Sequence, residues 1–560
     1  MRILLLCHSF NSLSQRLFIE LTQTGHEISV EFDIHDAITE EAVALYRPDL
    51  IVAPFLKRAI PATVWRKQVC LVLHPGIIGD RGPSALDWAI LDKQPEWGVT
   101  VLQAGAEMDC GDIWSATSFP MRLAKKSTLY RNEVTEAAIT AILDAVAKFA
   151  TSRFTPEPLD YSRPEVHGRQ RPLVRQHDRS IQWDKDDTHT VLRKIHAADG
   201  FPGVLDSMFG EPLHMFDAST GENLYGSPGE IIARSDTAIC RATLDGAVWI
   251  GHLQRKTAQE PSFKLPATHV LDGKLNGLAE VAEAQTDIRY TERNMVGYLS
   301  FDFYNGAMAS EQCERLRAAY QQATRRDTRV IVLLGGEDFW SNGIHLNLIE
   351  AADSPADESW RNINAMNDLA LAILNTDRQL TIAALRGNAG AGGVFLALAA
   401  DQVLARTGVV LNPHYKAMGN LYGSEYWTYL LPRRVGDDLA RQVTDNRLPL
   451  GTAQACKIGL IDASFGSSPA NFLKEVETRA ETIAAAIDFP TKLADKLARR
   501  TREEALKPLA VYRAEELERM TLNFYGFDPS YHVARHHFVN KLPLSRTPRH
   551  LAQHRRIRGI

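Results

Sequence analysis

The sequence predicts an α/β protein built from several domains, and three observations support that prediction. The chain has 560 residues, more than a single hydrophobic core usually organises. Short apolar runs alternate with amphipathic stretches in two separate regions, residues 1–150 and 295–469, as strands and helices do in turn. A segment rich in proline and arginine, residues 151–176, interrupts the chain as domain boundaries commonly do. We therefore place domains at 1–155, 156–285, 286–470 and 471–560.

The first domain contains five short apolar runs, which we predict to be strands of a parallel sheet with helices between them. They are residues 3–7, 28–32, 50–55, 70–74 and 99–103. Ser9 and Asn11 follow the first run, in a turn rich in helix-capping side chains. Because this turn has no G-x-G-x-x-G motif, a dinucleotide-binding site is disfavoured.

The remaining segments predict other kinds of structure. Alternating residues at 229–233 and 247–251 indicate a small β-barrel or sandwich. The runs 330–334 and 381–385 each lead into a glycine-rich turn. From about residue 471 the pattern is helical, with Glu515, Glu516 and Arg519 among its i,i+3 and i,i+4 charge pairs. Residues 541–560 carry six Lys or Arg and no acid, which is typical of a flexible or docking tail.

The composition excludes several classes of protein. With 63 basic and 68 acidic residues, the net charge of −5 argues against a general nucleic-acid binder, so small molecules or proteins are the expected partners. The six cysteines form no C-x-x-C pair, which disfavours a zinc knuckle or a disulfide framework. No apolar run approaches the length of a membrane span. We therefore expect a cytoplasmic protein with neither a nucleic-acid nor a membrane partner.

His74 and Asp112 are the first candidates for catalysis. Each stands just at or after an apolar run, and parallel sheets bind ligands at the carboxyl ends of their strands. A histidine beside a buried carboxylate can shuttle protons while an acyl group moves between nucleophiles. From the residues alone, a polar pair that merely satisfies its hydrogen bonds is about equally frequent.

The segments around these residues resemble the folate-dependent formyltransferases, the family of methionyl-tRNA and glycinamide-ribotide formyltransferases. The resemblance rests on residues 74–82, 98–101 and 111–113, and on residues 200–203, 246–248 and 264–267. It implies a Rossmann-like parallel sheet, a small barrel of the oligonucleotide-binding (OB) type, and 10-formyltetrahydrofolate as a substrate. It also implies that His74 is the general acid/base, that Asp112 orients it, and that the folate pocket is lined by Ser9, Asn11, Arg81, Gly82, Gln103 and Asp109.

One departure from that family concerns the oxyanion. The family has an asparagine two residues before the histidine, where this sequence has Val72. Removing one oxyanion donor typically costs on the order of 10²–10³ in rate. Either another donor replaces it, or the acceptor is a better nucleophile than an amine, such as a thiol.

Two glycine-containing turns stand in the third domain. One spans residues 340–346 and includes Gly343 and Ile344, and the other spans residues 386–393 and includes Gly392 and Gly393. Glycine lets the backbone approach a ligand closely, and two free N–H groups suit a carbonyl oxygen that gains negative charge. Glycine clusters alone are weak evidence, because most of them are simply turns.

The order and spacing of these turns resemble the crotonase (enoyl-CoA hydratase/isomerase) superfamily. The resemblance covers residues 295–466 and implies a crotonase-like ββα superhelix domain that binds coenzyme A (CoA) thioesters. It implies oxyanion donors at the N–H groups of Ile344 and Gly392, and CoA contacts at Asn305, Gly343 and Gly393.

The sequence departs from the hydratases where they carry two catalytic glutamates. Phe395 and His414 stand at those positions, so addition of water to a double bond is not expected. The stretch that ordinarily faces the acyl group offers His414, Tyr415 and Glu425, of which we favour His414 and Glu425 as proton carriers. Each of these side chains taken singly could instead serve packing.

A metal site is not expected. His532 and His536 stand four residues apart on a helical stretch, but no glutamate accompanies them as in H-E-x-x-H. A structural helix is several times more frequent than a metal site for such a pair.

The order of the two halves, together with residues 338–347 and 512–517, closely resembles the HoxX-type hydrogenase maturation proteins over essentially the whole chain. That resemblance implies synthesis of the carbon monoxide (CO) ligand of the NiFe-hydrogenase iron, from 10-formyltetrahydrofolate through formyl-CoA. Hydrogenase maturation proteins or the hydrogenase large subunit are then the candidate protein partners. Two alternatives stay open: a formyl-CoA-forming transferase or hydrolase that releases formate, and a non-catalytic scaffold that binds CoA or folate.

Overall fold

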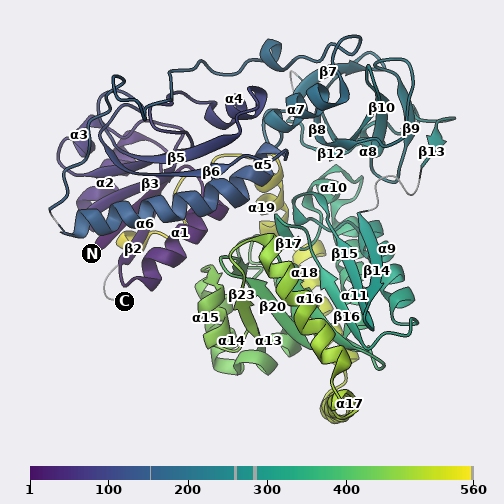
Figure 1. Ribbon diagram of the computed structural model, residues 1–560. Coiled ribbons are helices and arrows are strands. Elements are labelled where there is room, and N and C mark those ends of the chain that lie inside the picture. Colours follow the sequence, from purple (N-terminus) through teal and green to yellow (C-terminus); the bar gives the residue numbers. More distant parts are fainter. Residues whose placement is uncertain (152, 258–260, 282–286, 557–560) are drawn as a thin grey trace. The chain divides into compact units, whose positions relative to one another are not determined.

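The computed structural model describes residues 1–151, 153–257, 261–281 and 287–556, and the chain divides into two units (Figure 1). Unit 1 comprises Met1–Gln285 together with Leu544–Ile560, and unit 2 comprises Thr286–Pro543. The boundary expected between residues 285 and 286 lies outside the described residues. The described residues from 544 onward fold with the first unit, whereas the sequence predicts one extension from residue 471 to the end.

The first sheet of unit 1 has six strands in the order β2-β1-β3-β4-β5-β6. Its strands are β1 (Arg2–Cys7), β2 (Glu27–Phe32), β3 (Leu50–Phe55), β4 (Cys70–His74), β5 (Glu96–Gln103) and β6 (Ile113–Pro120). Its helices are α1 (Ser12–Gln23), α2 (Asp36–Tyr46), α3 (Ala62–Trp65), α4 (Ala85–Leu91), α5 (Lys126–Leu129), the π-helix η1 (Tyr130–Val134) and α6 (Thr135–Thr151). Figure 1 shows α1 and α6 side by side along this sheet. The five apolar runs are thereby confirmed as strands.

The prediction of a parallel sheet holds for β1 to β4 and is wrong for β5, and β6 is a strand that the sequence does not predict. β5 runs antiparallel to β4, and β6 runs antiparallel to β5. Residues 104–112 are the whole connection between β5 and β6, and a parallel pair would need a longer crossover. The sheet is therefore mixed, and residues 104–112 form a return loop beside β4.

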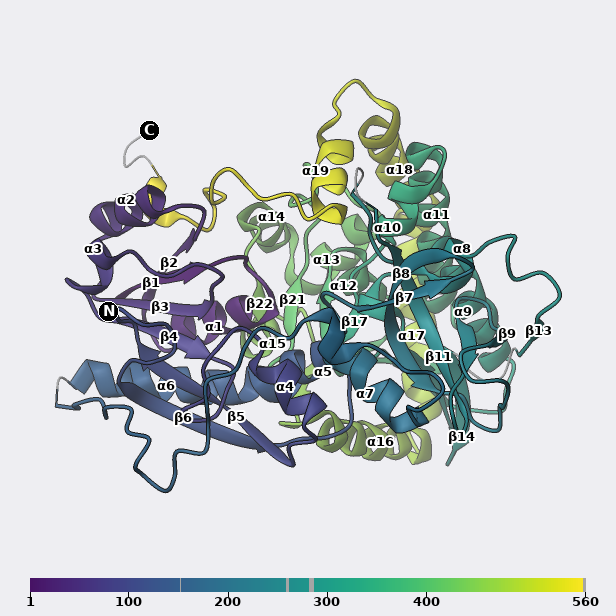
Figure 2. The same ribbon diagram turned by 90° about the horizontal axis from the view of Figure 1, so that it is seen from above.

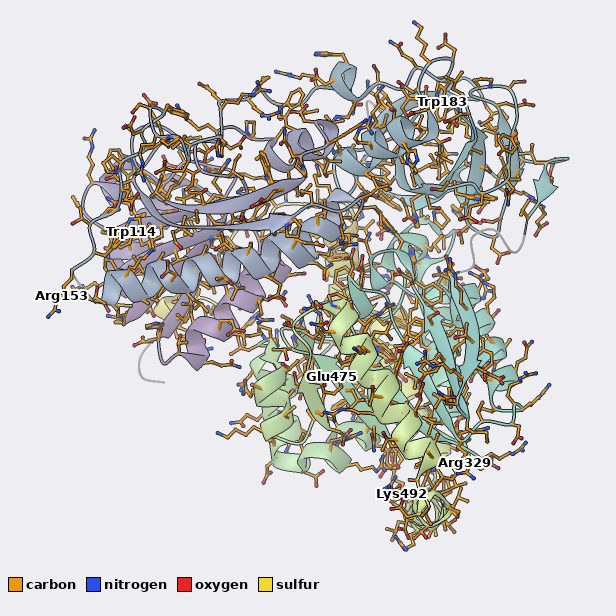
Figure 3. All side chains as sticks on the ribbon, viewed as in Figure 1. Trp114, Arg153, Trp183, Arg329, Glu475 and Lys492 are labelled. Carbon is orange, nitrogen blue, oxygen red and sulfur yellow. The ribbon has the colours of Figure 1, made fainter. Side chains whose placement is uncertain are left out.

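A second sheet in unit 1 confirms the small β domain. Its order is β13-β9-β10-β11-β8-β7, with β12 paired to β11. The elements are η2 (Gln176–Arg179), α7 (Thr188–Ala198), β7 (Val204–Met208), β8 (Glu211–Thr220), β9 (Ile231–Arg234), β10 (Ile239–Ala242), β11 (Ala247–Arg255), β12 (Leu265–Pro266), α8 (Ala267–Val270) and β13 (Ala279–Glu280). Trp249 and Cys240 are buried in its core. Trp183, labelled in Figure 3, lies with its ring 4.0 Å from the Arg241 guanidinium.

Unit 2 contains two sheets between which the chain alternates. The larger has the order β14-β15-β16-β18-β20-β23 and comprises β14 (Ile288–Arg293), β15 (Val296–Phe301), β16 (Val330–Leu334), β18 (Leu380–Leu385), β20 (Gln402–Arg406) and β23 (Ala463–Phe465). The smaller has the order β17-β19-β21-β22 and comprises β17 (Phe339–Ser341), β19 (Asn388–Gly390), β21 (Val410–Asn412) and β22 (Leu450–Gly451). Strands β16 and β18 lead into β17 and β19 of the smaller sheet, and Gly343 and Gly392 of the two glycine turns come shortly after these two strands.

Helices cover both faces of the larger sheet. They are η3 (Tyr304–Gly306), α9 (Ser310–Ala323), α10 (Leu346–Ala351), α11 (Pro355–Leu374), α12 (Gly392–Leu398), α13 (Trp427–Val435), α14 (Asp437–Asn446), α15 (Thr452–Lys457), α16 (Pro469–Ala485), α17 (Phe489–Leu506), α18 (Leu509–Tyr525) and α19 (Ser530–Val539). Figure 1 shows α16 running across the sheet, where its apolar residues join those of β15, β16 and β20 in one core. Across the described residues, we find no helix with the length and apolar character needed to cross a membrane.

The last described residues return to unit 1. The short helix η4 (Gln553–Arg555) lies beside α2, as the yellow segment in Figure 2 shows. The backbone N–H of Val30 on β2 donates a hydrogen bond of 3.1 Å to the carbonyl of Leu551. Leu551 and Ala552 are both buried there. The basic tail is therefore docked on the edge strand β2.

Candidate active sites

His74 is the last residue of β4 and is buried, with 4% of the residue exposed. Cys70 to Leu73 are apolar and largely buried, so the strand carries the imidazole to the carboxyl end of the parallel part of the sheet. Gly76, two residues further along the chain, lies very close to the His74 ring. A Cβ atom at Gly76 would lie 2.5 Å from His74 Nε2, so only glycine leaves room for the ring.

Two carboxylates flank the imidazole of His74. Its Nε2 lies 2.9 Å from Asp80 Oδ2, and its Nδ1 lies 3.5 Å from Asp109 Oδ1. Asp80 is buried. Asp109 is held in place by a 3.2 Å hydrogen bond that the Gly82 N–H donates to its Oδ2. Each ring nitrogen of His74 therefore faces a carboxylate oxygen.

The charge state of His74 follows from this arrangement. Burial by itself would lower the pKa of His74, because it penalises the charged imidazolium. The hydrogen bonds and negative charges of Asp109 and Asp80 outweigh burial and raise the pKa of His74 to about 9. At neutral pH the site therefore holds an imidazolium that can donate a proton.

The prediction that Asp112 orients His74 is wrong. Asp112 is exposed, and its backbone carbonyl accepts a 2.9 Å hydrogen bond from the Gln103 N–H. Gly111 passes so close to β5 that a Cβ on it would lie 1.7 Å from the Gln103 carbonyl oxygen, and this close turn carries Asp112 away from the imidazole. Asp109, which the sequence places only in the folate pocket, contacts His74 instead. Asp80, within the motif 74–82, was not singled out from the sequence.

The segment rich in proline and arginine, residues 151–176, joins the two domains of unit 1. This joint lies against the loop that follows His74. A Cβ on Gly82 would lie 2.3 Å from the carbonyl oxygen of Arg171 in that joint. Arg171 Nε lies 3.8 Å from Asp80 Oδ1. Arg81 Nη2, on the same loop, lies 3.2 Å from Glu107 Oε2. The joint therefore contributes a cation beside the buried Asp80.

The other residues predicted to line the folate pocket have local partners. Gln103 Oε1 accepts a 3.1 Å hydrogen bond from Nε1 of Trp114, which Figure 3 labels on β6. Asn11 caps α1 by accepting a 3.0 Å hydrogen bond from the Ser14 N–H. The carbonyl of Ser9 accepts a bond from the hydroxyl of Ser14.

In unit 2, the two glycine turns meet. A Cβ on Gly343 would lie 3.4 Å from Gly392 N, and a Cβ on Gly393 would lie 2.1 Å from the carbonyl oxygen of Ser341. Gly392 is the first residue of α12. In the described part of the chain, the N–H groups of Ile344 and Gly392 have no backbone hydrogen-bond partner. Two donors at such a junction suit a carbonyl oxygen that gains negative charge.

Glu425 faces this junction. A Cβ on Gly392 would lie 2.5 Å from Glu425 Oε1. Glu425 is 1% exposed, and Oε1 has no hydrogen-bond partner among the described residues. The other oxygen, Oε2, accepts a hydrogen bond from the Tyr415 hydroxyl. The ring of Phe395 stacks on that of Tyr415, with centroids 5.3 Å apart and 19° between planes, so the position of a hydratase glutamate is filled by an apolar support.

Burial sets the protonation of this pair. It raises the pKa of Glu425 to about 8, against the hydrogen bond from Tyr415, and the charge of Glu516 raises it further. Burial also raises the pKa of Tyr415, as do the charge and hydrogen bond of Glu425. Tyr415 therefore stays protonated, and Glu425 is the group that exchanges a proton near neutral pH.

The other predicted residues of unit 2 are brought near the same turns. Asn305 lies in η3, and its carbonyl accepts a 2.9 Å hydrogen bond from the Asn342 side chain, next to Gly343. His414 follows β21 and is buried. In the described structure the side-chain contact with Glu425 is made by Tyr415.

One acidic residue has a different environment from the one that the sequence predicts. The sequence pattern assigns Glu516 to i,i+3 and i,i+4 charge pairs, but Glu516 is 0% exposed on α18. The buried residues of this helix include Glu516, Met520 and Phe524, and their spacing of four marks one helix face. That spacing was the available signal for a buried carboxylate.

Comparisons with known proteins match the regions of the chain that contain these two candidate sites. Residues 29–146 match the family model "Formyl transferase", residues 173–264 match "Formyl transferase, C-terminal domain", and residues 301–527 match "Enoyl-CoA hydratase/isomerase". The last match continues past residue 470, where the sequence predicts the end of that domain, and includes α18. These matches confirm the formyltransferase and crotonase resemblances.

Three similar proteins show how far the likeness extends. The hydrogenase maturation factor HoxX of Bradyrhizobium diazoefficiens is 55% identical over 99% of this chain and 97% of its own length. The solved structure of HypX from Aquifex aeolicus in complex with tetrahydrofolic acid is 49% identical, with a TM-score of 0.96 and full coverage of both chains. A methionyl-tRNA formyltransferase of Trichlorobacter lovleyi is 25% identical over 38% of this chain and 67% of its own.

Proposed function

The chain belongs to the family of the hydrogenase maturation factor HoxX, and from that premise we propose that it makes CO for the NiFe-hydrogenase iron. In this proposal unit 1 transfers the formyl group of 10-formyltetrahydrofolate to the thiol of CoA, and unit 2 splits the resulting formyl-CoA into CO and CoA. The tetrahydrofolic acid bound to the solved relative supports folate as a substrate. The enoyl-CoA hydratase/isomerase match supports CoA.

The first step depends on the proton held by His74. The CoA sulfur forms a bond to the formyl carbon as a thiolate, and the bond between that carbon and the folate nitrogen breaks. The leaving nitrogen takes the proton of the His74 imidazolium, which Asp80 and Asp109 hold charged. Solvent then returns a proton to His74. A charged His74 also supplies positive charge near the developing oxyanion, where Val72 offers no amide.

The second step depends on Glu425. The N–H groups of Ile344 and Gly392 donate hydrogen bonds to the formyl oxygen, while the unpartnered Oε1 of Glu425 removes the formyl proton. The bond between carbon and sulfur breaks with its electrons going to sulfur, and the electrons of the former C–H bond remain on carbon as CO. Glu425 returns its proton to the thiolate. A carboxylate whose pKa is about 8 is a stronger base than an ordinary one.

One observation carries the proposal: a buried carboxylate with a free oxygen lies against the Gly392 backbone, while Phe395 fills the position of a hydratase glutamate. Such a site can take up a proton beside a polarised carbonyl without a second acid/base group for adding water. The acceptors of the CO are then hydrogenase maturation proteins or the hydrogenase large subunit.

The test measures CO with reduced haemoglobin. Purified protein is incubated with 10-formyltetrahydrofolate, with and without CoA, and we expect the CO spectrum only when CoA is present. Formate without CO would favour the formate-releasing transferase or hydrolase, and neither product would favour the non-catalytic scaffold. Glu425→Gln should let formyl-CoA accumulate, whereas Glu518→Gln on the exposed face of α18 should behave as the parent protein.

A further inference from the structure

The segment that carries Glu425 has an unusual backbone. Glu425 and Tyr426 have φ values of 58° and 60°, so two successive residues with side chains lie in the left-handed region. L-residues with a Cβ avoid this region, and such geometry persists only where surrounding contacts impose it. Something must therefore hold residues 424–428, and with them the carboxyl of Glu425.

Glu516 on α18 supplies most of those contacts. Its Oε2 accepts a hydrogen bond from the Tyr426 N–H (3.0 Å) and lies 3.3 Å from the Ser424 hydroxyl, whose one proton it shares with Asn367. Its Oε1 accepts bonds from the N–H (2.9 Å) and the hydroxyl (2.6 Å) of Thr428. All of these partners belong to the segment 424–428, and they bracket Glu425 on both sides.

A second residue holds the same segment from α11. Asn367 Oδ1 accepts a 2.7 Å hydrogen bond from the Glu425 N–H and a 2.9 Å bond from the Ser424 hydroxyl. Glu425 is therefore fixed through its own backbone and through both neighbours. Its side chain is left to contact Tyr415 and Gly392.

The use of a carboxylate at residue 516 is chemically specific. Among the described residues, no Lys, Arg or His forms an ion pair with Glu516, in contrast to the partly buried Asp401, which pairs with Lys496 at 2.7 Å. A glutamine would present an NH₂ group to either the Ser424–Tyr426 donors or the Thr428 donors, so one pair of bonds would be lost. Only an acceptor at both oxygen positions satisfies this segment.

We propose that Glu516 is a positioning residue that acts through residues 424–428 to hold the Glu425 carboxyl beside Gly392. The inference rests on the proposed function, because it assigns Glu425 the proton of formyl-CoA. It also assigns a task to the helix after residue 470 that the sequence treats as a separate extension.

The electrostatic consequence gives a readout that a purely structural role would not change. The negative charge of Glu516 adds to burial in raising the pKa of Glu425. Burial raises the pKa of Glu516 itself to about 7, against the hydrogen bonds from Thr428, Tyr426 and Ser424, so this charge is present above that pH. Tyr415 and Cys313 also interact with Glu425, and burial raises the pKa of both, so they stay neutral. Removing the charge at residue 516 should lower the pKa of Glu425.

The experiment supplies formyl-CoA directly and follows CO release by the full-length protein. We expect Glu516→Gln to lower kcat by about 10²-fold, since a displacement of about 1 Å can have that effect. The KM for formyl-CoA should stay within about twofold, and the pH at half-maximal rate should move downward. Formyl transfer from folate to CoA in unit 1 should be unchanged, and Glu518→Gln should match the parent. If Glu516→Gln does not fold, Thr428→Val is the variant to test. It removes one donor to Glu516, and we expect a smaller loss of kcat.

Each outcome decides the matter. If the parent protein releases no CO from formyl-CoA, the proposed function fails and the role of Glu516 fails with it. If the parent releases CO and the variants at residues 516 and 428 keep its kcat and pH profile, the inference alone is overturned. An equal loss in formyl transfer would overturn it too, because the effect would not act through Glu425.

Discussion

His74 differs from an ordinary histidine because two carboxylates compete with burial for its charge. Asp80 and Asp109 approach opposite ring nitrogens, so the imidazolium is bound on both sides. Val72, two residues earlier on the same face of β4, brings no amide to the site. In the proposed transfer, the charge on His74 would therefore act where an asparagine amide is expected from the formyltransferase resemblance.

The first prediction concerns the pH dependence of this charge. Because the carboxylates raise the pKa of His74 to about 9, the donor form persists through neutral pH and is lost as the pH rises through that value. Asp80→Asn or Asp109→Asn should lower the pKa of His74. As the pH is raised, the rate of formyl transfer to CoA should therefore begin to fall at a lower pH than in the parent protein. An NMR titration of His74 measures the shift directly, and each unit corresponds to about 1.4 kcal/mol. Asp112→Asn, at an exposed residue, is the matched control. An unchanged titration of His74 in Asp80→Asn would contradict the role of the two carboxylates in holding the imidazolium.

The second prediction concerns the acceptor. Val72→Asn would place an amide on the face of β4 that carries His74. Because one oxyanion donor is worth on the order of 10²–10³ in rate, we expect transfer to a primary amine to rise by at least about tenfold. Transfer to CoA should change less, since a thiolate is the better nucleophile. Comparing the two acceptors in one assay checks this, and no gain with an amine in a protein that still forms formyl-CoA would refute it.

At the residue scale, the sequence could narrow the candidates but not rank them. It offers His414, Tyr415 and Glu425 and favours His414 and Glu425 as proton carriers, whereas the structure places Tyr415 in contact with Glu425. Asp109 and Asp112 could not be ranked, because both carboxylates fall in one short loop. The choice depends on the left-handed φ of 55° at Asp109 and on the tight approach of Gly111 to β5, and neither is visible in residue spacing.

Elements were predictable where burial is uniform. The strands β16 and β18 consist of apolar residues buried along nearly their whole length, and their apolar runs marked them clearly. β6 was missed, since buried and exposed residues are mixed along it and no continuous run appears. Its antiparallel direction follows from the short loop before it, which is a property of the connection rather than of the strand.

The third prediction concerns β2 and the tail docked on it. Glu31 on β2 is fully buried and accepts hydrogen bonds from His554 (2.8 Å) and Arg555 (2.7 Å). Removing one partner of a buried pair typically costs about 3–5 kcal/mol, because the other charge stays buried alone. Glu31→Ala should therefore destabilise unit 1 by a few kcal/mol, measured by denaturation and by hydrogen exchange in β2. Glu27→Ala, at an exposed glutamate of the same strand, should have little effect.

The sign of the pH effect follows from the pKa of Glu31. Burial raises this pKa, but the hydrogen bonds from His554, Thr547 and Arg555 outweigh burial, so it lies below its ordinary value of 4.5. The contribution to stability is therefore present above that value and is lost as the pH falls through the lower, folded-state pKa. If the amides of β2 stayed protected from hydrogen exchange at a pH well below 4, the Glu31 carboxylate would not be the group that holds the tail.

At the scale of the whole molecule, order in the sequence is not order in the structure. The sequence predicts consecutive domains that end in a basic tail, yet the chain leaves unit 1 near residue 285 and re-enters it near residue 544. The absence of acids in residues 541–560 predicts only a flexible or docking tail, and in the structure Arg555 contacts Glu31 and Glu41. Sequence patterning could not identify that partner, because it reports neighbours along the chain and the two segments lie more than 500 residues apart.

The last prediction tests unit 1 as a discontinuous unit. A chain of residues 1–285 alone would leave buried Glu31 and the N–H of Val30 without their partners from residues 547–555. Unsatisfied buried groups cost about 1–3 kcal/mol each and more when charged, so this fragment should unfold at a lower temperature. Joining residues 544–560 to residue 285 through a flexible linker should restore stability, because closing such a loop costs only about 0.6 kcal/mol for each doubling of its length. Calorimetry of both fragments measures the difference in melting temperature. The control is the linked fragment with His554→Ala and Arg555→Ala in its tail. Equal melting temperatures for the two fragments would show that the tail lies on β2 without stabilising unit 1.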